Sequence, residues 1–84
     1  MQSYKELPFD ARPFEQICAP LYGTYEYYEL RSALVAELKC TPRSVDNWAT
    51  GRNRPLNYAT KKLIEIVVSK QLGIKCDYKT LFPL

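Results

Sequence analysis

The chain has 84 residues, so its apolar side chains can form only one stable core, and we expect a single globular domain. Hydrophobic residues make up 46% of the sequence and charged residues 25%, which argues against disorder, and no apolar run is long enough to span a membrane. The net charge is a modest +3 and no signal peptide opens the sequence, so these features predict a cytoplasmic protein without a membrane partner.

The beginning of the chain predicts an irregular arm. Residues 1–11 have mixed polarity and Pro8 breaks any helix there, while Phe9 is apolar enough to dock on the domain that follows. We therefore expect the domain proper to comprise residues 12–84.

A first helix is expected between residues 10 and 22. Pro13 suits an early helical position. Four apolar residues then recur at helical spacing, namely Phe14, Ile17, Cys18 and Leu21. Pro20 and Gly23 should end this helix or kink it.

The clearest amphipathic helix is expected at residues 25–38. Thr24 precedes it and is a good N-cap. Its apolar stripe consists of Tyr27, Leu30, Leu34 and Leu38. Lys39 and Cys40 should then form a turn.

A short third helix is expected at residues 42–49. The Thr41 hydroxyl can cap free backbone N–H groups, and Pro42 suits the first helical position. Val45 and Trp48 fall on the inner side of this helix, and a glycine shortly after it should stop it.

A fourth helix is expected at residues 58–71, with Asn57 as its N-cap and Gly73 as its C-terminal stop. The residues predicted to face inward are Ala59, Leu63, Ile66, Val67 and the stem of Lys70. One more helical turn within residues 77–82 should place Leu81 and Phe82 against the body of the domain. Nothing in the chain alternates like a strand, so we predict an all-α fold of four to five helices.

The stretch between residues 34 and 55 combines a specific set of residues. They are Leu34, Leu38, Thr41, Val45 and the Trp-x-x-Gly-x-x-x-Pro ending of Trp48, Gly51 and Pro55. This set resembles the helix-turn-helix of the lambda-repressor-like family, the Cro and xenobiotic-response-element type of small transcription regulators. The resemblance extends over residues 30–83 and implies a lambda-repressor-like domain that binds DNA.

Three features differ from the family pattern. Lys39 stands at the turn position usually given to glycine, and a positive φ would strain it. Val35 replaces the small residue commonly packed between the two helices, and the first 23 residues have no evident counterpart.

Positive charge is concentrated around the third helix. Residues 37–62 hold six cations against two carboxylates, a net +4, whereas residues 1–36 hold three cations against five carboxylates, a net −2. A polyanion would be attracted to the first of these segments.

Polar residues on the outer side of the third helix are the candidate base-reading residues, because side chains of such a helix reach base edges in the major groove. These residues are Arg43, Ser44, Asp46 and Asn47. Candidate phosphate contacts are Thr41 at the helix start and the cations Arg52, Arg54 and Lys61. The pattern predicts sequence-specific binding of double-stranded DNA by a small transcriptional regulator.

We expect a homodimer, because one module of this size buries only about 600–1,000 Å² against DNA. Candidate dimer surfaces are the aromatic N-terminal segment and the tail formed by residues 74–84. The alternative function is a protein-interaction module or antitoxin-like partner on the same scaffold, whose tyrosine-rich N-terminal region holds a second protein.

Catalysis has little support in the sequence. Histidine is absent, which removes the commonest general base and metal ligand, and Glu26 with Glu29 is more simply a solvated helix face. The three cysteines are far apart, which argues against a zinc site or a disulfide framework and predicts buried thiols: Cys18, Cys40 and Cys76. We therefore expect no enzymatic activity, no metal and no cofactor.

Overall fold

The computed structural model describes residues 7–83, and within them the chain is all-α, as predicted. The elements are α1 (Phe14–Cys18), the 3-10 turn η1 (Ala19–Leu21), α2 (Tyr25–Leu38), α3 (Pro42–Ala49), α4 (Tyr58–Leu72) and α5 (Tyr78–Leu81). The β pairing found in this part of the chain is an isolated bridge between Phe9 and Lys75. None of its helices is long and apolar enough to cross a membrane.

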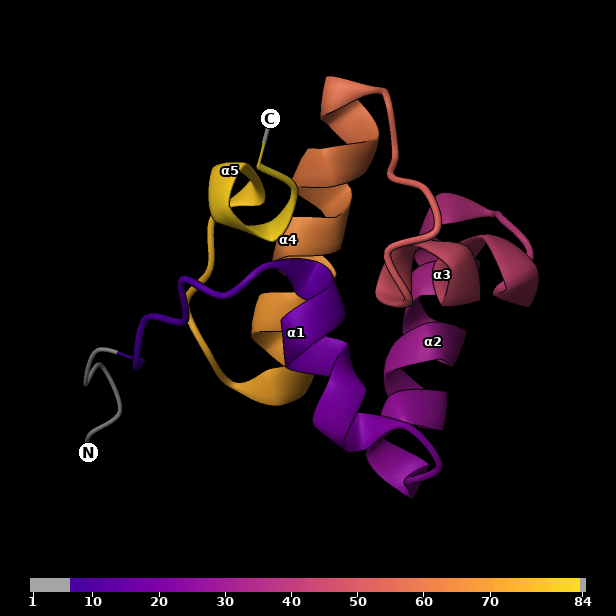
Figure 1. Cartoon of the computed structure of the whole chain (residues 1–84), viewed down its shortest axis with the longest axis horizontal. Coiled ribbons are helices and arrows are strands. Elements are labelled where there is room, and N and C mark those ends of the chain that lie inside the picture. The colour runs from indigo at the N-terminus through magenta and orange to yellow at the C-terminus, as the bar shows by residue number, and fades with distance from the viewer. Residues whose placement is uncertain (1–6, 84) are drawn as a thin grey trace.

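Two antiparallel helices, α2 and α4, form the centre of the domain (Figure 1). α1 packs against α3 and α5, and α3 also packs against α2. As a result α3 and the turn before it lie on one side of the molecule, while the segment between α4 and α5 lies on the other (Figure 1).

The first helix is shorter than the expected span of residues 10–22. Pro13 precedes α1 as an extended N-cap residue, and the α-helix ends at Cys18 before continuing as η1. Pro20 explains this break, because it has no N–H to continue the α-helical hydrogen bonds.

The expected bounds of α2 and α3 are confirmed, and both helices are capped by threonine. The Thr24 hydroxyl accepts from the N–H of Tyr27, and the Thr41 hydroxyl accepts from the N–H of Ser44. Between the two helices, Lys39 adopts the left-handed conformation with φ of 54°. Lysine therefore occupies a position that favours glycine.

The predicted inner face of α4 was partly wrong. Val67 is buried as expected, but Ile64 and Val68 are its buried companions, whereas Leu63 and Ile66 are 37% and 53% exposed. The expectation failed because α4 carries apolar residues on two faces, and only its tertiary contacts, which include α2 and α5, select one of them.

The core gathers residues from every helix. Its largest fully buried side chains are Phe14, Leu30, Leu34, Ile64, Leu81, Val45, Val68 and Cys18. Burial raises the pKa of the Cys18 thiol to about 12. Cys40 and Cys76 are only partly buried, and all three are free thiols.

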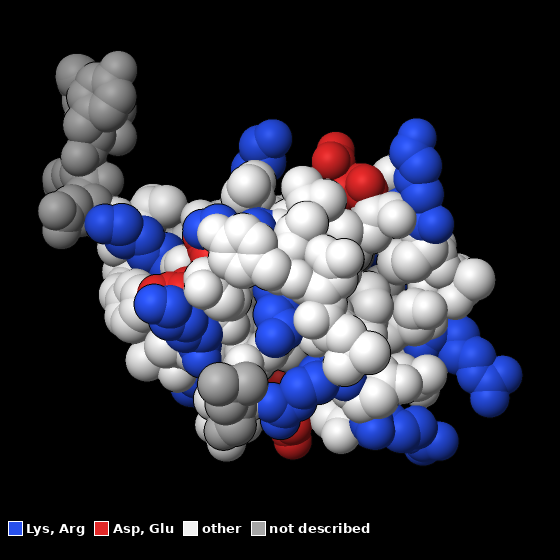
Figure 2. All heavy atoms as spheres, turned by 90° about the horizontal axis from the view of Figure 1, so that it is seen from above, with Lys and Arg blue, Asp and Glu red and all other residues white. Residues whose placement is uncertain are grey.

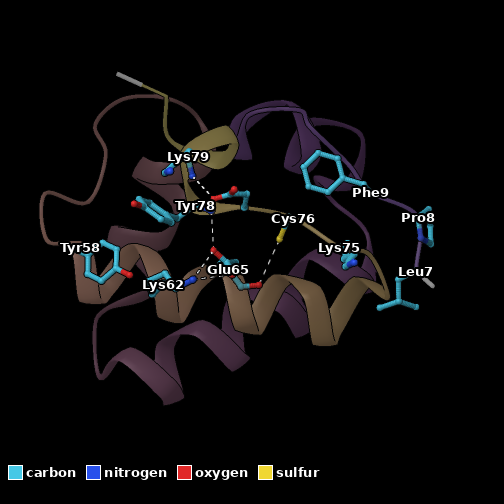
Figure 3. A pocket seen from close by; sticks show the side chains of 11 residues that line it. Leu7, Pro8, Phe9, Tyr58, Lys62, Glu65, Lys75, Cys76, Tyr78 and Lys79 are labelled. Carbon is cyan, nitrogen blue, oxygen red and sulfur yellow. Dashed lines mark hydrogen bonds and ion pairs between the residues drawn. The ribbon is translucent and has the colours of Figure 1, made fainter. Parts of the chain in front are cut away.

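The C-terminal tail is fixed to the body of the domain by side-chain contacts. Leu81 and Phe82 are buried as expected, and the Phe82 ring lies 5.6 Å from that of Phe14. Glu65 of α4 accepts a hydrogen bond from the N–H of Tyr78 at 2.9 Å (Figure 3). The tail is therefore part of the folded core.

Candidate nucleic-acid interface

The start of α3 is fixed by two hydroxyl groups. Thr41 Oγ1 accepts from the backbone N–H of Ser44 at 3.2 Å, and the two side-chain oxygens lie 3.1 Å apart. Pro42 occupies the first turn, where its missing N–H costs nothing. The hydroxyl groups of Thr41 and Ser44 thus form the helix cap within the chain itself.

The two sides of α3 differ as the sequence predicted. Val45 and Ala49 are fully buried, and Trp48 packs against the core while remaining partly exposed. On the opposite side Arg43 is exposed and Asn47 is partly exposed. Within residues 7–83 their side chains make no hydrogen bond, so both are available to an external partner.

Asp46 has a different position from the one expected of a base-reading residue. Its carboxylate accepts a hydrogen bond from the Tyr27 hydroxyl at 2.5 Å and forms an ion pair with Arg31 at 2.9 Å. Both donors belong to α2, so the carboxylate fastens α3 to α2. We therefore do not retain Asp46 among the candidate base contacts.

A second contact holds the C-terminal end of α3. The Tyr22 hydroxyl donates to the backbone carbonyl of Ala49. Tyr22 and Tyr27 also meet edge to face, with ring centroids 5.2 Å apart. Burial raises the pKa of the Tyr27 phenol, and its hydrogen bond to the Asp46 carboxylate raises it further.

Sequence reasoning missed these positioning residues, which are Tyr22, Tyr27 as a hydrogen-bond donor, and Arg31. Their partners on α3 lie 15 to 27 residues away along the chain, and no local spacing rule connects such positions. Thr50 was also missed, although helical spacing places it in line with Arg43 and Asn47. It is exposed, and its hydroxyl donates to the Asp46 carbonyl at 2.8 Å.

The loop after α3 turns sharply at Gly51, whose φ is 77°. A Cβ atom at this position would come 2.5 Å from the carboxylate of the exposed Glu15 side chain, which can move aside, so the positive φ is the main reason for glycine here. The backbone N–H of Arg52 then donates to the Asn47 carbonyl at 2.9 Å. This bond keeps the exposed Arg52 close to the outer face of α3.

The other two predicted phosphate contacts, Arg54 and Lys61, differ from Arg52 in their surroundings. Arg54 is exposed but donates through Nη1 to the Pro83 carbonyl, so its guanidinium already holds the C-terminal tail. Lys61 lies in the first half of α4 and is partly buried. Figure 2 shows one face of the molecule, on which lysine and arginine side chains are spread around the surface with few carboxylates between them.

No cluster of metal-binding side chains is found in the part of the chain that the structure describes. Within residues 7–83 no three side chains of the His, Cys, Asp or Glu type lie close enough together to hold a metal ion.

Comparisons of the chain with protein-family models, with curated proteins and with solved structures found no match.

Proposed function

We propose that the protein binds double-stranded DNA sequence-specifically, with α2 and α3 acting as a lambda-repressor-like helix-turn-helix and α3 entering the major groove. A small transcriptional regulator is the corresponding biological role. The observation that carries this proposal is the outer face of α3, where Arg43 and Asn47 project from a helix whose other side is packed and fastened.

Rigid attachment of α3 supports a reading function. Side chains discriminate between bases only when the helix that presents them is held in one orientation, because each hydrogen bond depends on position within a fraction of an ångström. The contacts of Asp46 and of the Ala49 carbonyl with α2 and the preceding turn supply this attachment. In this arrangement Arg43 suits guanine and Asn47 suits adenine.

Phosphate binding is assigned to the cations that follow α3. Arg52 is the principal contact, because its backbone is bonded to α3 and its side chain is exposed. Lys61 adds positive charge from α4, and Arg54 contributes after releasing the Pro83 carbonyl. The backbone N–H of Arg43 at the helix start is a further donor for a phosphate oxygen.

A second candidate function, a protein-interaction module or antitoxin-like partner, is favoured by two exposed aromatic side chains. Tyr25 is 76% exposed and Tyr28 is half exposed, and both project from the beginning of α2. Aromatic residues on a surface are common anchors of protein interfaces. This function and DNA binding can coexist, since Tyr25 and Tyr28 do not belong to α3.

Titration of fluorescently labelled duplex DNA at two salt concentrations tests the proposal. A DNA reader should bind random duplex at micromolar concentration, with an affinity that falls steeply as salt rises. Selection of bound sequences from random oligonucleotides should then recover a preferred site. Absence of binding at low salt would reject the DNA proposal and favour the interaction module.

A further inference from the structure

A groove on the outer side of α2 and α4 contains two exposed apolar residues of α4, Leu63 and Ile66. Its lining residues are Ala33, Ala36, Glu37, Leu63, Ile66, Val67, Lys70 and Gln71. Ile66 and Leu63 are exposed, and the residues of α2 beside them are alanines. Small residues allow a helix of another molecule to approach closely, and an apolar surface of this kind marks a protein contact.

Charges of opposite sign lie toward opposite ends of this groove. The helices α2 and α4 are antiparallel (Figure 1), so the last turn of α2, which carries Glu37, lies toward the N-terminal half of α4, whereas Lys70 is in the last turn of α4. Leu63 and Lys70 are separated by about 10 Å along α4, since each residue adds about 1.5 Å. Within residues 7–83 neither Glu37 nor Lys70 takes part in an ion pair.

We propose that this groove is the contact surface between two copies of the chain, with Glu37 of each copy opposite Lys70 of the other. A two-fold axis in the plane of contact and perpendicular to the groove exchanges the two ends of the groove. The result is an apolar centre formed by Ile66 and Leu63 of both copies, flanked by two identical ion pairs. The surface is therefore complementary to itself in charge.

Other parts of the molecule fit this assignment. Within the C-terminal tail, Leu81 and Phe82 are buried in their own chain and are not offered to a second copy. No lining residue of the groove comes from α3 or from the loop at residues 50–57, so pairing leaves the proposed DNA interface uncovered. The proposed contact does not involve DNA, so dimerisation is measured on the protein alone.

Sedimentation velocity over a range of protein concentrations measures the dimer directly. Ile66→Glu places a carboxylate in the apolar centre and should raise the dimer dissociation constant at least about a hundredfold, because charges buried without a partner are unfavourable. Leu56→Glu is the matched control, since Leu56 is 92% exposed and lies outside the groove. The control should leave the dissociation constant unchanged, and circular dichroism melting should show that both variants fold.

Charge reversal provides a test that a folding defect cannot imitate. Glu37→Lys and Lys70→Glu each place like charges opposite one another at both ends of the dimer, so each variant alone should dissociate at least about tenfold more readily. In an equimolar mixture the two variants meet with opposite charges at both positions. Mixing should therefore restore a dimer that neither variant forms alone at the same concentration.

Three results would overturn the proposal. The first is a native chain that stays monomeric at about 100 μM, well above the micromolar range of weak specific complexes. The second is dimerisation unaffected by Ile66→Glu, which would place the contact elsewhere. The third is a mixture of the two charge variants that remains monomeric, which would exclude the paired arrangement of Glu37 and Lys70.

Discussion

Neighbouring side chains on α3 have different roles because they differ in what they touch. Asp46 is held by Tyr27 and Arg31, so its carboxylate stabilises the packing of α3 on α2. Asn47, the next residue, keeps its side-chain amide free of hydrogen bonds to residues 7–83 while its backbone carbonyl accepts from Arg52. An amide with this freedom can donate to and accept from adenine at the same time.

Asn47→Ala should therefore weaken binding to the preferred DNA site by about 1–3 kcal/mol and have little effect on random duplex. Fluorescence anisotropy titrations of the two duplexes at one salt concentration measure the difference. Asn53→Ala removes the same side-chain amide from the following loop and should leave the ratio of the two affinities unchanged. Equal losses on both duplexes in Asn47→Ala would contradict a base-reading role.

Lys39 shows the cost of a residue that does not match its backbone conformation. Its φ of 54° lies in the left-handed region, which is unfavourable for a side chain with a Cβ atom. Lys39→Gly should raise the free energy of unfolding by about 0.5–1 kcal/mol, since relief of strain exceeds the added entropy of the unfolded chain. Urea denaturation measures the change.

Lys39→Ala serves as the control for the loss of charge. It removes the ammonium group but keeps the Cβ atom, so the strain remains and no comparable stabilisation is expected. Equal stabilisation by alanine and glycine would show that charge, and not backbone conformation, is responsible.

At the scale of elements, helix bounds could be predicted because their signals are local. Thr24, Thr41 and Asn57 act as caps as predicted, and Gly73 adopts the left-handed conformation that ends α4. The buried face of α4 could not be predicted, because Leu63 and Ile66 form an apolar stripe as convincing as the one that contains Ile64. Only the three-dimensional contacts of α4, with α5 as well as with α2, distinguish them.

The candidate site also has one feature that the sequence predicted and one that it did not. The outward position of Arg43 and Asn47 followed from helical spacing alone, and the structure places both on the outer side of α3, with Arg43 exposed and Asn47 partly exposed. The contacts that fasten α3 could not be predicted, because Asp46 and its donors are far apart in sequence. Spacing thus identified a surface residue, Asp46, without revealing that it already had partners.

Tyr27→Phe tests how α3 is held on α2. The change removes one hydrogen bond to a charged acceptor and should lower the free energy of unfolding at pH 7 by about 1–2 kcal/mol. Tyr25→Phe removes an exposed hydroxyl group and should have almost no effect. Urea denaturation of both variants at pH 7 makes the comparison.

The same pair of variants predicts a pH dependence. The pKa of Tyr27 is raised in the folded state, first by burial and then by Asp46, so the folded protein holds this proton more tightly than the unfolded chain. Its contribution is complete below the unfolded pKa of about 10 and is lost as pH rises from there toward the higher folded pKa. Above pH 10, native protein should lose stability more steeply than Tyr27→Phe, and parallel curves would contradict this.

At the scale of the whole molecule, charge is distributed unevenly around a small core. The segment from residue 37 to residue 62 carries a net +4, and it includes α3 and the loop that leads to α4. The segment between α4 and α5, which holds Lys75, lies on the other side of the molecule (Figure 1). A DNA duplex on α3 should therefore contact Arg52 and not Lys75.

Arg52→Ala and Lys75→Ala both remove one positive charge, so their comparison separates a local phosphate contact from net charge. A cation that neutralises a DNA phosphate releases condensed counterions, and the slope of log affinity against log salt changes by about 0.9 for each phosphate that is no longer neutralised. Arg52→Ala should reduce the slope by about one on every duplex sequence, whereas Lys75→Ala should leave it unchanged. Equal slopes for the two variants would mean that DNA does not contact the loop after α3, and that the proposed orientation of the duplex on α3 is wrong.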